Sequence, residues 1–133
     1  MTEKKGLLSG KRGIIMGAAN NRSIAWGIAK KAAEEGAELA FTYQGEQIEK
    51  RVRPLAESLG SSLILPCDVT DTASIDAVFA AVEEKWGRLD FLVHAIAYSD
   101  KEELTGRYVD TSPDNFAKSM NISYYSFTTL AQR

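Results

Sequence analysis

Apolar residues along the chain alternate between short continuous runs and longer stretches of helical period. Four short runs have the length and composition of β-strands: 12–16, 38–43, 62–67 and 89–95. Between them, apolar side chains recur three or four positions apart, as on the buried face of an α-helix, within residues 24–33, 48–59 and 75–86. A glycine follows each helical stretch, at Gly36, Gly60 and Gly87, where a helix commonly ends.

Two parts of the chain depart from this alternation. Pro54 interrupts the second helical stretch, and since proline lacks an amide donor and clashes with the preceding turn, we expect a kink there or a helix that begins near Pro54. Residues 99–111 are polar and irregular, and Pro113 begins a last helix that is apolar at positions 116, 120, 124, 127 and 130. No further strand follows this helix, so we expect the sequence to be cut short.

Strict alternation of strands and helices predicts an α/β fold with right-handed crossovers. We expect a Rossmann-like, doubly wound parallel sheet in the strand order 3-2-1-4, truncated before strand 5. The prediction is a single domain over residues 1–133 that is incomplete at its C-terminal end.

Composition and charge exclude several classes of partner. The chain is 44% hydrophobic and 26% charged with a formal net charge of −2, which offers no broad positive field for nucleic acid, and its apolar runs are too short to span a membrane. The first nine residues lack the apolar core of a signal peptide, so we expect a cytoplasmic protein, with no nucleic acid, membrane or metal among its partners. The single cysteine, Cys67, follows an apolar run and is expected to be buried and inert rather than reactive.

Ligands of doubly wound sheets bind beyond the carboxyl ends of the strands, where the strand order reverses. The segments expected at this edge are 17–23, 43–44, 68–69 and 94–99. At the first of them, a glycine turn at Gly17 would let a pyrophosphate approach the backbone, and amides near Ser23 and Ile24 could donate to its oxygens. Only Gly17 and Gly27 remain of the usual three closely spaced glycines, so a phosphate site and a simple structural turn both fit the spacing.

Five sequence blocks, in order along the chain, resemble one known family. They are Gly-Ala-Ala-Asn-Asn-Arg-Ser-Ile-Ala-Trp-Gly-Ile-Ala from residue 17, Gly-Ala-Glu-Leu-Ala-Phe-Thr-Tyr-Gln to residue 44, Cys-Asp-Val from 67, Phe-Leu-Val-His-Ala-Ile-Ala from 91, and Ser-Tyr-Tyr-Ser-Phe from 123. Together they are similar to the bacterial enoyl-acyl-carrier-protein reductases, a divergent branch of the short-chain dehydrogenase/reductase superfamily. The elongated glycine loop distinguishes this branch from ketoacyl reductases.

The resemblance implies a nicotinamide cofactor with defined contacts along the sheet edge. Gly17, Ser23 and Ile24 would contact its pyrophosphate and ribose, and Gln44 would lie beside the adenosine ribose. The family mostly uses NADH, and Glu46 would repel a 2′-phosphate. The basic residues Lys50, Arg51 and Arg53 keep NADPH as an alternative.

The resemblance also assigns residues after the third and fourth strands. Asp68 and Val69 would hold the adenine, although Asp68 could instead cap the following helix. Ile96 would lie against the cofactor through its backbone, and Ser99 would border the acyl substrate.

Other polar or ionisable residues near the expected site are weaker candidates. His94 replaces no acid or base of the family and lies at the end of an apolar strand, so we do not expect it to be catalytic. Asn121 matches a superfamily asparagine of a proton relay, but a polar residue facing solvent fits as well. Ala95 and Ala97 stand where family members often have serine and glycine, which leaves the floor of the pocket undetermined.

The catalytic tyrosine and lysine of the family, which are separated by six residues, have no counterpart after residue 100 and are expected beyond Arg133. Tyr43 and Lys50 have this spacing, but they follow the second strand, on the adenosine side, and we interpret the match as chance. The implied reaction is hydride transfer to the β-carbon of a trans-2-enoyl thioester on acyl carrier protein, within fatty acid biosynthesis, by a homotetramer. The segment alone is expected to be inactive; a non-catalytic NAD(H)-binding module and another short-chain oxidoreductase are the alternatives.

Overall fold

The computed structural model describes residues 5–133, which form two compact units that divide after Ala95. The expectation that no signal peptide occupies the first nine residues falls partly on residues 1–4, outside the described part. No helix of residues 5–133 combines the length and apolar character needed to cross a membrane.

The first unit contains a parallel sheet of four strands in the order β3-β2-β1-β4, which confirms the order 3-2-1-4 predicted from the sequence. The strands are β1 (Arg12–Met16), β2 (Glu38–Tyr43), β3 (Leu63–Pro66) and β4 (Phe91–His94). The bounds of β1 and β2 agree with the apolar runs, whereas β3 and β4 are shorter than theirs.

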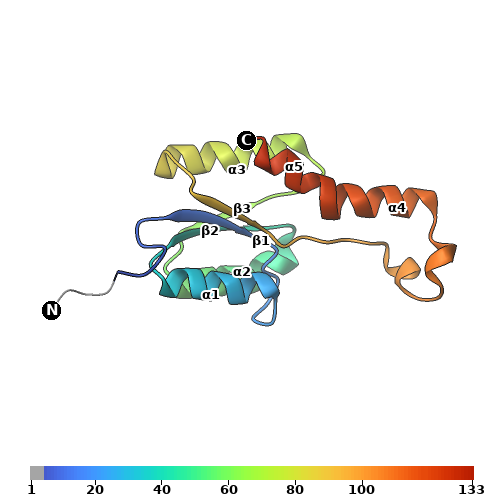
Figure 1. The fold of residues 1–133 in the computed structure, drawn as a ribbon, viewed down its shortest axis with the longest axis horizontal. Helices are drawn as coiled ribbons and strands as arrows, with labels where there is room; N and C mark the ends of the chain where they lie inside the picture. Colours follow the sequence, from blue (N-terminus) through green and yellow to red (C-terminus); the bar gives the residue numbers. More distant parts are fainter. Residues whose placement is uncertain (1–4) are drawn as a thin grey trace. The chain divides into compact units, whose positions relative to one another are not determined.

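Helices cover both faces of this sheet. They are α1 (Ile24–Glu34), α2 (Glu46–Ser58) and α3 (Thr72–Trp86). In Figure 1, α1 and α2 lie on one face and α3 on the other. Because successive strand residues point to opposite faces, Ile14 and Ile15 are buried on different sides, with exposed fractions of 1% and 0%. The continuous apolar runs of the sequence are therefore explained by a sheet that helices cover on both faces.

Helix α2 rules out one of the two alternatives drawn from Pro54, a helix that begins near the proline, and the kink stays a prediction. The helix begins at Glu46 and continues through Pro54 to Ser58, so it does not begin near the proline. Pro54 lies on the exposed face, where water can satisfy the carbonyl of Lys50 that would otherwise accept an amide hydrogen bond. The opposite face is held by Val52 and Ala56, which are both fully buried against the sheet.

The second unit is helical and follows the polar segment predicted to be irregular. Within that segment two short 3₁₀ helices form, η1 (Lys101–Leu104) and η2 (Tyr108–Asp110). The last helix begins at Pro113 as expected, but it consists of α4 (Pro113–Met120), a π-helical turn η3 (Asn121–Tyr125) and α5 (Ser126–Ala131). A π turn holds more residues than an α turn, so it rotates the side chains that follow. Within the expected apolar stripe, Leu130 is buried, whereas the other four members are more than 40% exposed.

Candidate functional site

The carboxyl ends of the strands in the first unit form one edge of the sheet. Met16 pairs with Thr42 and Tyr43 pairs with Pro66, so β1, β2 and β3 end at nearly the same level. Adjacent strands lie about 4.8 Å apart, which sets a width of roughly 10 Å across these three strands. The residues expected in the site that follow these strand ends are Gly17, Gln44, Asp68 and Val69.

Gly17 leaves β1 in a conformation that suits only glycine. Its φ is +102°, in the region that L side chains rarely adopt. A Cβ added here would also overlap the carbonyl group of Ala95, the residue after β4. The backbones that follow β1 and β4 therefore approach each other so closely that no side chain fits between them.

The loop from Gly17 to α1 is organised by the hydroxyl of Ser23. Ser23 Oγ accepts hydrogen bonds from the backbone amides of Ala19 (3.0 Å) and Asn20 (3.1 Å). The side chain of Asn20 in turn accepts from the amide of Arg22 at 2.7 Å. Three loop amides are thus engaged by side chains of the loop itself, which stabilises its path.

Ser23 occupies the N-cap position of α1 but does not cap it. Its side chain makes no hydrogen bond to the helix amides, and the amide of Trp26 donates to the Ser23 carbonyl at 3.1 Å. The amides of Ile24 and Ala25 are the remaining donors of this first turn, and they coincide with the positive end of the helix dipole. The arrangement can accept an anionic oxygen, which favours the phosphate interpretation over a simple turn.

The segment after β2 contains a cluster that the sequence analysis missed. Arg53 and Glu49, one helical turn apart on α2, form an ion pair of 2.7 Å whose charges act on the phenol of Tyr43. Burial raises the pKa of Tyr43, and the Glu49 carboxylate adds to the rise. Tyr43 therefore lies within the influence of the α2 ion pair, while Lys50 is exposed, which favours the view that their spacing is chance. The spacing of four residues between Glu49 and Arg53 could have revealed the pair.

Asp68, after β3, forms a local turn. Its Oδ1 accepts from the amide (2.9 Å) and the hydroxyl (2.6 Å) of Thr70, and its own amide donates to Ser74 Oγ at 2.8 Å. The alternative that Asp68 caps the next helix is wrong, because Asp71 is the N-cap of α3 and accepts from the amide of Ala73 at 3.0 Å. No donor of residues 5–133 forms a hydrogen bond to Asp68 Oδ2, so this oxygen can accept one from a ligand.

Three further residues of the first unit have simple surroundings. Gln44 is exposed and Val69 is half-buried. Cys67 is buried as expected, and this burial raises the pKa of its thiol, which keeps it in the unreactive protonated form. His94 is the last residue of β4, pairs with Met16 in the sheet register and is half-buried.

The remaining residues predicted for the site belong to the second unit. Ile96 is half-buried, and Ser99 Oγ accepts a hydrogen bond of 3.1 Å from the side-chain amide of Asn115. Asn121 is exposed and opens the π turn, which agrees with a solvent-facing polar residue. Sequence reasoning did not single out Asn115, because nothing in the local pattern distinguishes a buried asparagine from an exposed one.

The parallel sheet, its strand order and the glycine turn before α1 define a Rossmann-like, doubly wound fold. Residues 17–133 match the protein family described as Enoyl-(Acyl carrier protein) reductase. The chain belongs to this family, as the five sequence blocks indicated.

Relatives with assigned names agree with the family. The chain is 66% identical over 133 residues to enoyl-[acyl-carrier-protein] reductase [NADH] 1 of Rhizobium meliloti, with 100% of this chain and 49% of that protein covered. It is 58% identical over 127 residues to the corresponding reductase FabI of Rickettsia bellii, with 96% and 48% covered. The chain thus spans about half the length of the curated relatives it matches.

Solved structures give the same result. The enoyl-(acyl-carrier-protein) reductase of Anaplasma phagocytophilum, in complex with NAD, has a TM-score of 0.91 at 56% identity, covering 99% of this chain and 50% of that one. The reductase of Aquifex aeolicus has a TM-score of 0.92 at 50% identity, covering 96% and 50%.

Proposed function

We propose that this chain is the cofactor-binding segment of an NADH-dependent enoyl-acyl-carrier-protein reductase of fatty acid biosynthesis. The observation that carries the proposal is 66% identity along all 133 residues to a protein named as that enzyme. The reductase reaction, its substrate and its partners are proposed for the whole protein.

The residues after β1 fit the pyrophosphate of a dinucleotide. A Cβ at Gly17 would overlap the Ala95 carbonyl, and the first-turn amides of α1 are not capped by a side chain. Gly17, Ser23 and Ile24 would hold the pyrophosphate and the adjoining ribose. Ser23 contributes in two ways, because its oxygen accepts from two loop amides while its hydroxyl hydrogen can donate to a ligand.

The segments after β2 and β3 fit the adenosine end. Exposed Gln44 would lie beside the ribose, and Asp68 Oδ2 would accept from the adenine amino group while the Val69 amide donates to the ring. Arg53 is paired with Glu49, which leaves it less able to hold a 2′-phosphate and favours NADH over NADPH. In the second unit, the Ile96 backbone would lie against the cofactor and Ser99 would border the acyl chain.

The proposed reaction reduces the trans-2 double bond of an enoyl thioester. When bound, NADH would supply the hydride that adds to C3 of the substrate, C2 would take a proton from water, and NAD⁺ would be the second product. Residues 17–133 would orient the cofactor and border the thioester, which is the positioning part of catalysis. The tyrosine and lysine of the family pattern would lie outside these 133 residues, in the half of the relatives' length that the chain does not span.

The remaining expectations belong to the same proposal. Residues 1–133 would be one Rossmann domain, completed by further strands, of a cytoplasmic homotetramer. The enoyl group would arrive on acyl carrier protein.

The proposal is tested by mixing the whole protein with NADH and a crotonyl thioester and following NADH absorbance. We expect NADH to be consumed and butyryl thioester to form. Binding of NADH without turnover would favour a non-catalytic module, and consumption of NADH with an acetoacetyl but not a crotonyl thioester would favour a ketoacyl reductase.

A further inference from the structure

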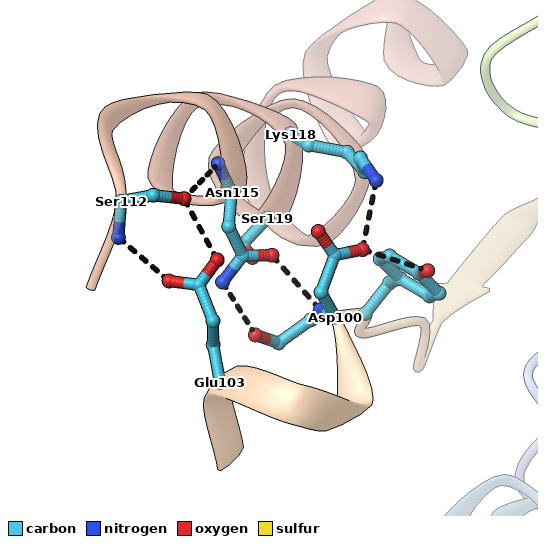
Figure 2. Close-up of polar contacts among 8 residues, drawn as sticks. Asp100, Glu103, Ser112, Asn115, Lys118 and Ser119 are labelled. Atoms are coloured by element: carbon cyan, nitrogen blue, oxygen red, sulfur yellow. Dashed lines mark hydrogen bonds and ion pairs between the residues drawn. The ribbon is translucent and has the colours of Figure 1, made fainter. Parts of the chain in front are cut away.

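Asn115 is a buried polar side chain of the second unit, with an exposed fraction of 3%. Its Oδ1 accepts from the backbone amide of Asp100 at 2.8 Å, and its Nδ2 donates to Ser99 Oγ at 3.1 Å. Ser119, one turn further along α4, donates to the same Oδ1 at 3.3 Å. Figure 2 shows the Asn115 side chain between α4 and the segment that carries Asp100. One amide group thus fastens two consecutive residues of the loop to the helix.

Two other contacts link this loop to the same helix. The Glu103 carboxylate accepts from the backbone amide (2.6 Å) and the hydroxyl (2.7 Å) of Ser112, the N-cap of α4 (Figure 2). Lys118 forms an ion pair with Asp100 at 2.7 Å, with side-chain exposed fractions of 48% and 28%. The Glu103 contact fastens η1, the 3₁₀ turn that follows Asp100, and it reaches Asp100 only through the hydrogen bond of 3.0 Å from the Glu103 amide to the Asp100 carbonyl.

These contacts differ in how strongly they hold residues 99 and 100. An exposed ion pair such as Lys118 with Asp100 contributes little, because solvent screens it and two long side chains lose freedom. Asn115 is buried and its two loop contacts are partly buried, so their loss would leave a backbone amide and a hydroxyl with less access to water as a replacement partner, which is the more costly change. Ser123 holds the preceding residue, Tyr98, through its amide (2.9 Å) and its carbonyl (3.2 Å). Of the contacts that α4 makes with Ser99 and Asp100 themselves, those of Asn115 are therefore the stronger.

We propose that Asn115 is a positioning residue, which holds Ser99 and the backbone of Asp100 in the conformation that borders the acyl thioester. The proposal rests on the function proposed above, which assigns Ser99 to the substrate side. Without Asn115 the loop populates other conformations, and only a fraction of the protein is ready to bind substrate. The apparent substrate affinity falls by that fraction, so a competent fraction of about one tenth raises KM about tenfold.

The test compares Asn115→Leu with Ser119→Ala in the whole protein. The leucine keeps most of the side-chain volume and removes both loop contacts, whereas Ser119→Ala removes only a contact made within α4. We expect Asn115→Leu to raise KM for crotonyl thioester about tenfold, with kcat and the NADH dissociation constant changed less than about twofold. Ser119→Ala should leave all three constants within about twofold of the unsubstituted protein.

A purely structural role would give a different pattern. If Asn115 only stabilised the fold, Asn115→Leu would lower the amount of active protein, so kcat would fall at unchanged KM, and the proposal would be overturned. An equal rise of KM in Ser119→Ala would also overturn it. Should the leucine variant fail to fold, Asn115→Ala decides, because it removes both loop contacts without placing a larger apolar group beside the loop. That variant should also raise KM about tenfold, with faster hydrogen exchange at the Asp100 amide than in Ser119→Ala; unchanged KM and exchange would refute the role of Asn115.

Failure of the proposed function is recognised separately. Absence of crotonyl thioester turnover in the unsubstituted protein refutes the reductase assignment and this role with it. Turnover in the unsubstituted protein with unchanged KM in both Asn115 variants refutes the role of Asn115 alone.

Discussion

Replacement of Gly17 by alanine tests whether the turn after β1 requires glycine for both its conformation and its space. A non-glycine residue at the observed φ of +102° is destabilised by about 1–2 kcal/mol. The added Cβ overlaps the Ala95 carbonyl, so the backbone after β4 must move. That movement strains the hydrogen bond of 3.1 Å from the Ala95 amide to the Met16 carbonyl, and loss of such a bond costs about 1–3 kcal/mol. The two effects together predict a decrease of about 2–5 kcal/mol in the free energy of unfolding.

Gly60→Ala is the matched control. Gly60 has a φ of +80°, but a Cβ there meets nothing within 4 Å, and the residue precedes β3, at the opposite end of the strands. The Gly60→Ala variant should therefore lose only the 1–2 kcal/mol of unfolding free energy, roughly, that the unfavourable φ costs, and it should bind NADH normally. Urea denaturation measures the stabilities and calorimetry the NADH affinity, which should fall at least about tenfold for Gly17→Ala alone. Equal stabilities of the two variants, with unchanged NADH affinity for Gly17→Ala, would refute the reasoning.

Four further predictions concern individual carboxylates, one tyrosine and the segment as a whole. Asp68→Ala should weaken NADH binding about tenfold, because an acceptor for the adenine amino group is lost. The control Asp71→Ala should lose about 1 kcal/mol of stability, because the cap of α3 is removed, and it should bind NADH normally. Calorimetry that finds equal NADH affinities for the two variants would contradict the adenine role. The amide of Arg12 donates to the Asp90 carboxylate and lowers the pKa of that carboxyl below its ordinary value of 3.8. The ionised Asp90 therefore stabilises the folded protein fully above pH 3.8, and this stabilisation is lost as the pH falls through the lowered pKa. Asp90→Asn should reduce this acid-dependent loss in urea denaturation, and an unaltered pH profile would count against it. Tyr43→Phe should retain turnover in the whole protein, since Tyr43 ends β2 on the side proposed for adenosine, and a loss as large as that of a catalytic group would reverse this view. The isolated segment 1–133 should consume no NADH with crotonyl thioester, and measurable turnover would show that the reaction does not need the rest of the protein.

The local pattern of apolar residues was sufficient to predict the strands that are buried on both faces of the sheet. The apolar runs at 12–16 and 38–43 match β1 and β2, because these strands are covered on both faces and almost every position must be apolar. Strand order followed from alternation and the handedness of crossovers rather than from any single residue.

The pattern failed where neighbours in space override local preference. Proline at position 54 normally ends or begins a helix, but the burial of Val52 and Ala56 stabilises α2 on both sides of it. Two aspartates lie three residues apart at 68 and 71, and only the backbone path determines which of them caps α3. The π turn at Asn121–Tyr125 has no signature of its own in the apolar spacing.

In the candidate site too, some residues were predicted from the sequence and other features are visible only in the structure. Gly17 and Asp68 were expected from the sequence, because they follow apolar strands in the order that a doubly wound sheet requires. The arrangement of the Ser23 hydroxyl, which accepts from loop amides instead of capping α1, is visible only in three dimensions.

By itself the sequence determined the strand order and the family, and it predicted the edge at which ligands would bind. These properties depend on periodicity and on motifs that are short and contiguous. Only the tertiary structure decided that Glu49 and Arg53 pair on α2, that Asp71 rather than Asp68 is the cap, and that Asn115 holds the loop of Ser99. The reason is that a hydrogen bond or an ion pair depends on the direction and burial of side chains. Side chains acquire these only when the chain folds, whether the partners lie two positions apart, as Asp71 and Ala73 do, or 15 apart, as Asp100 and Asn115 do.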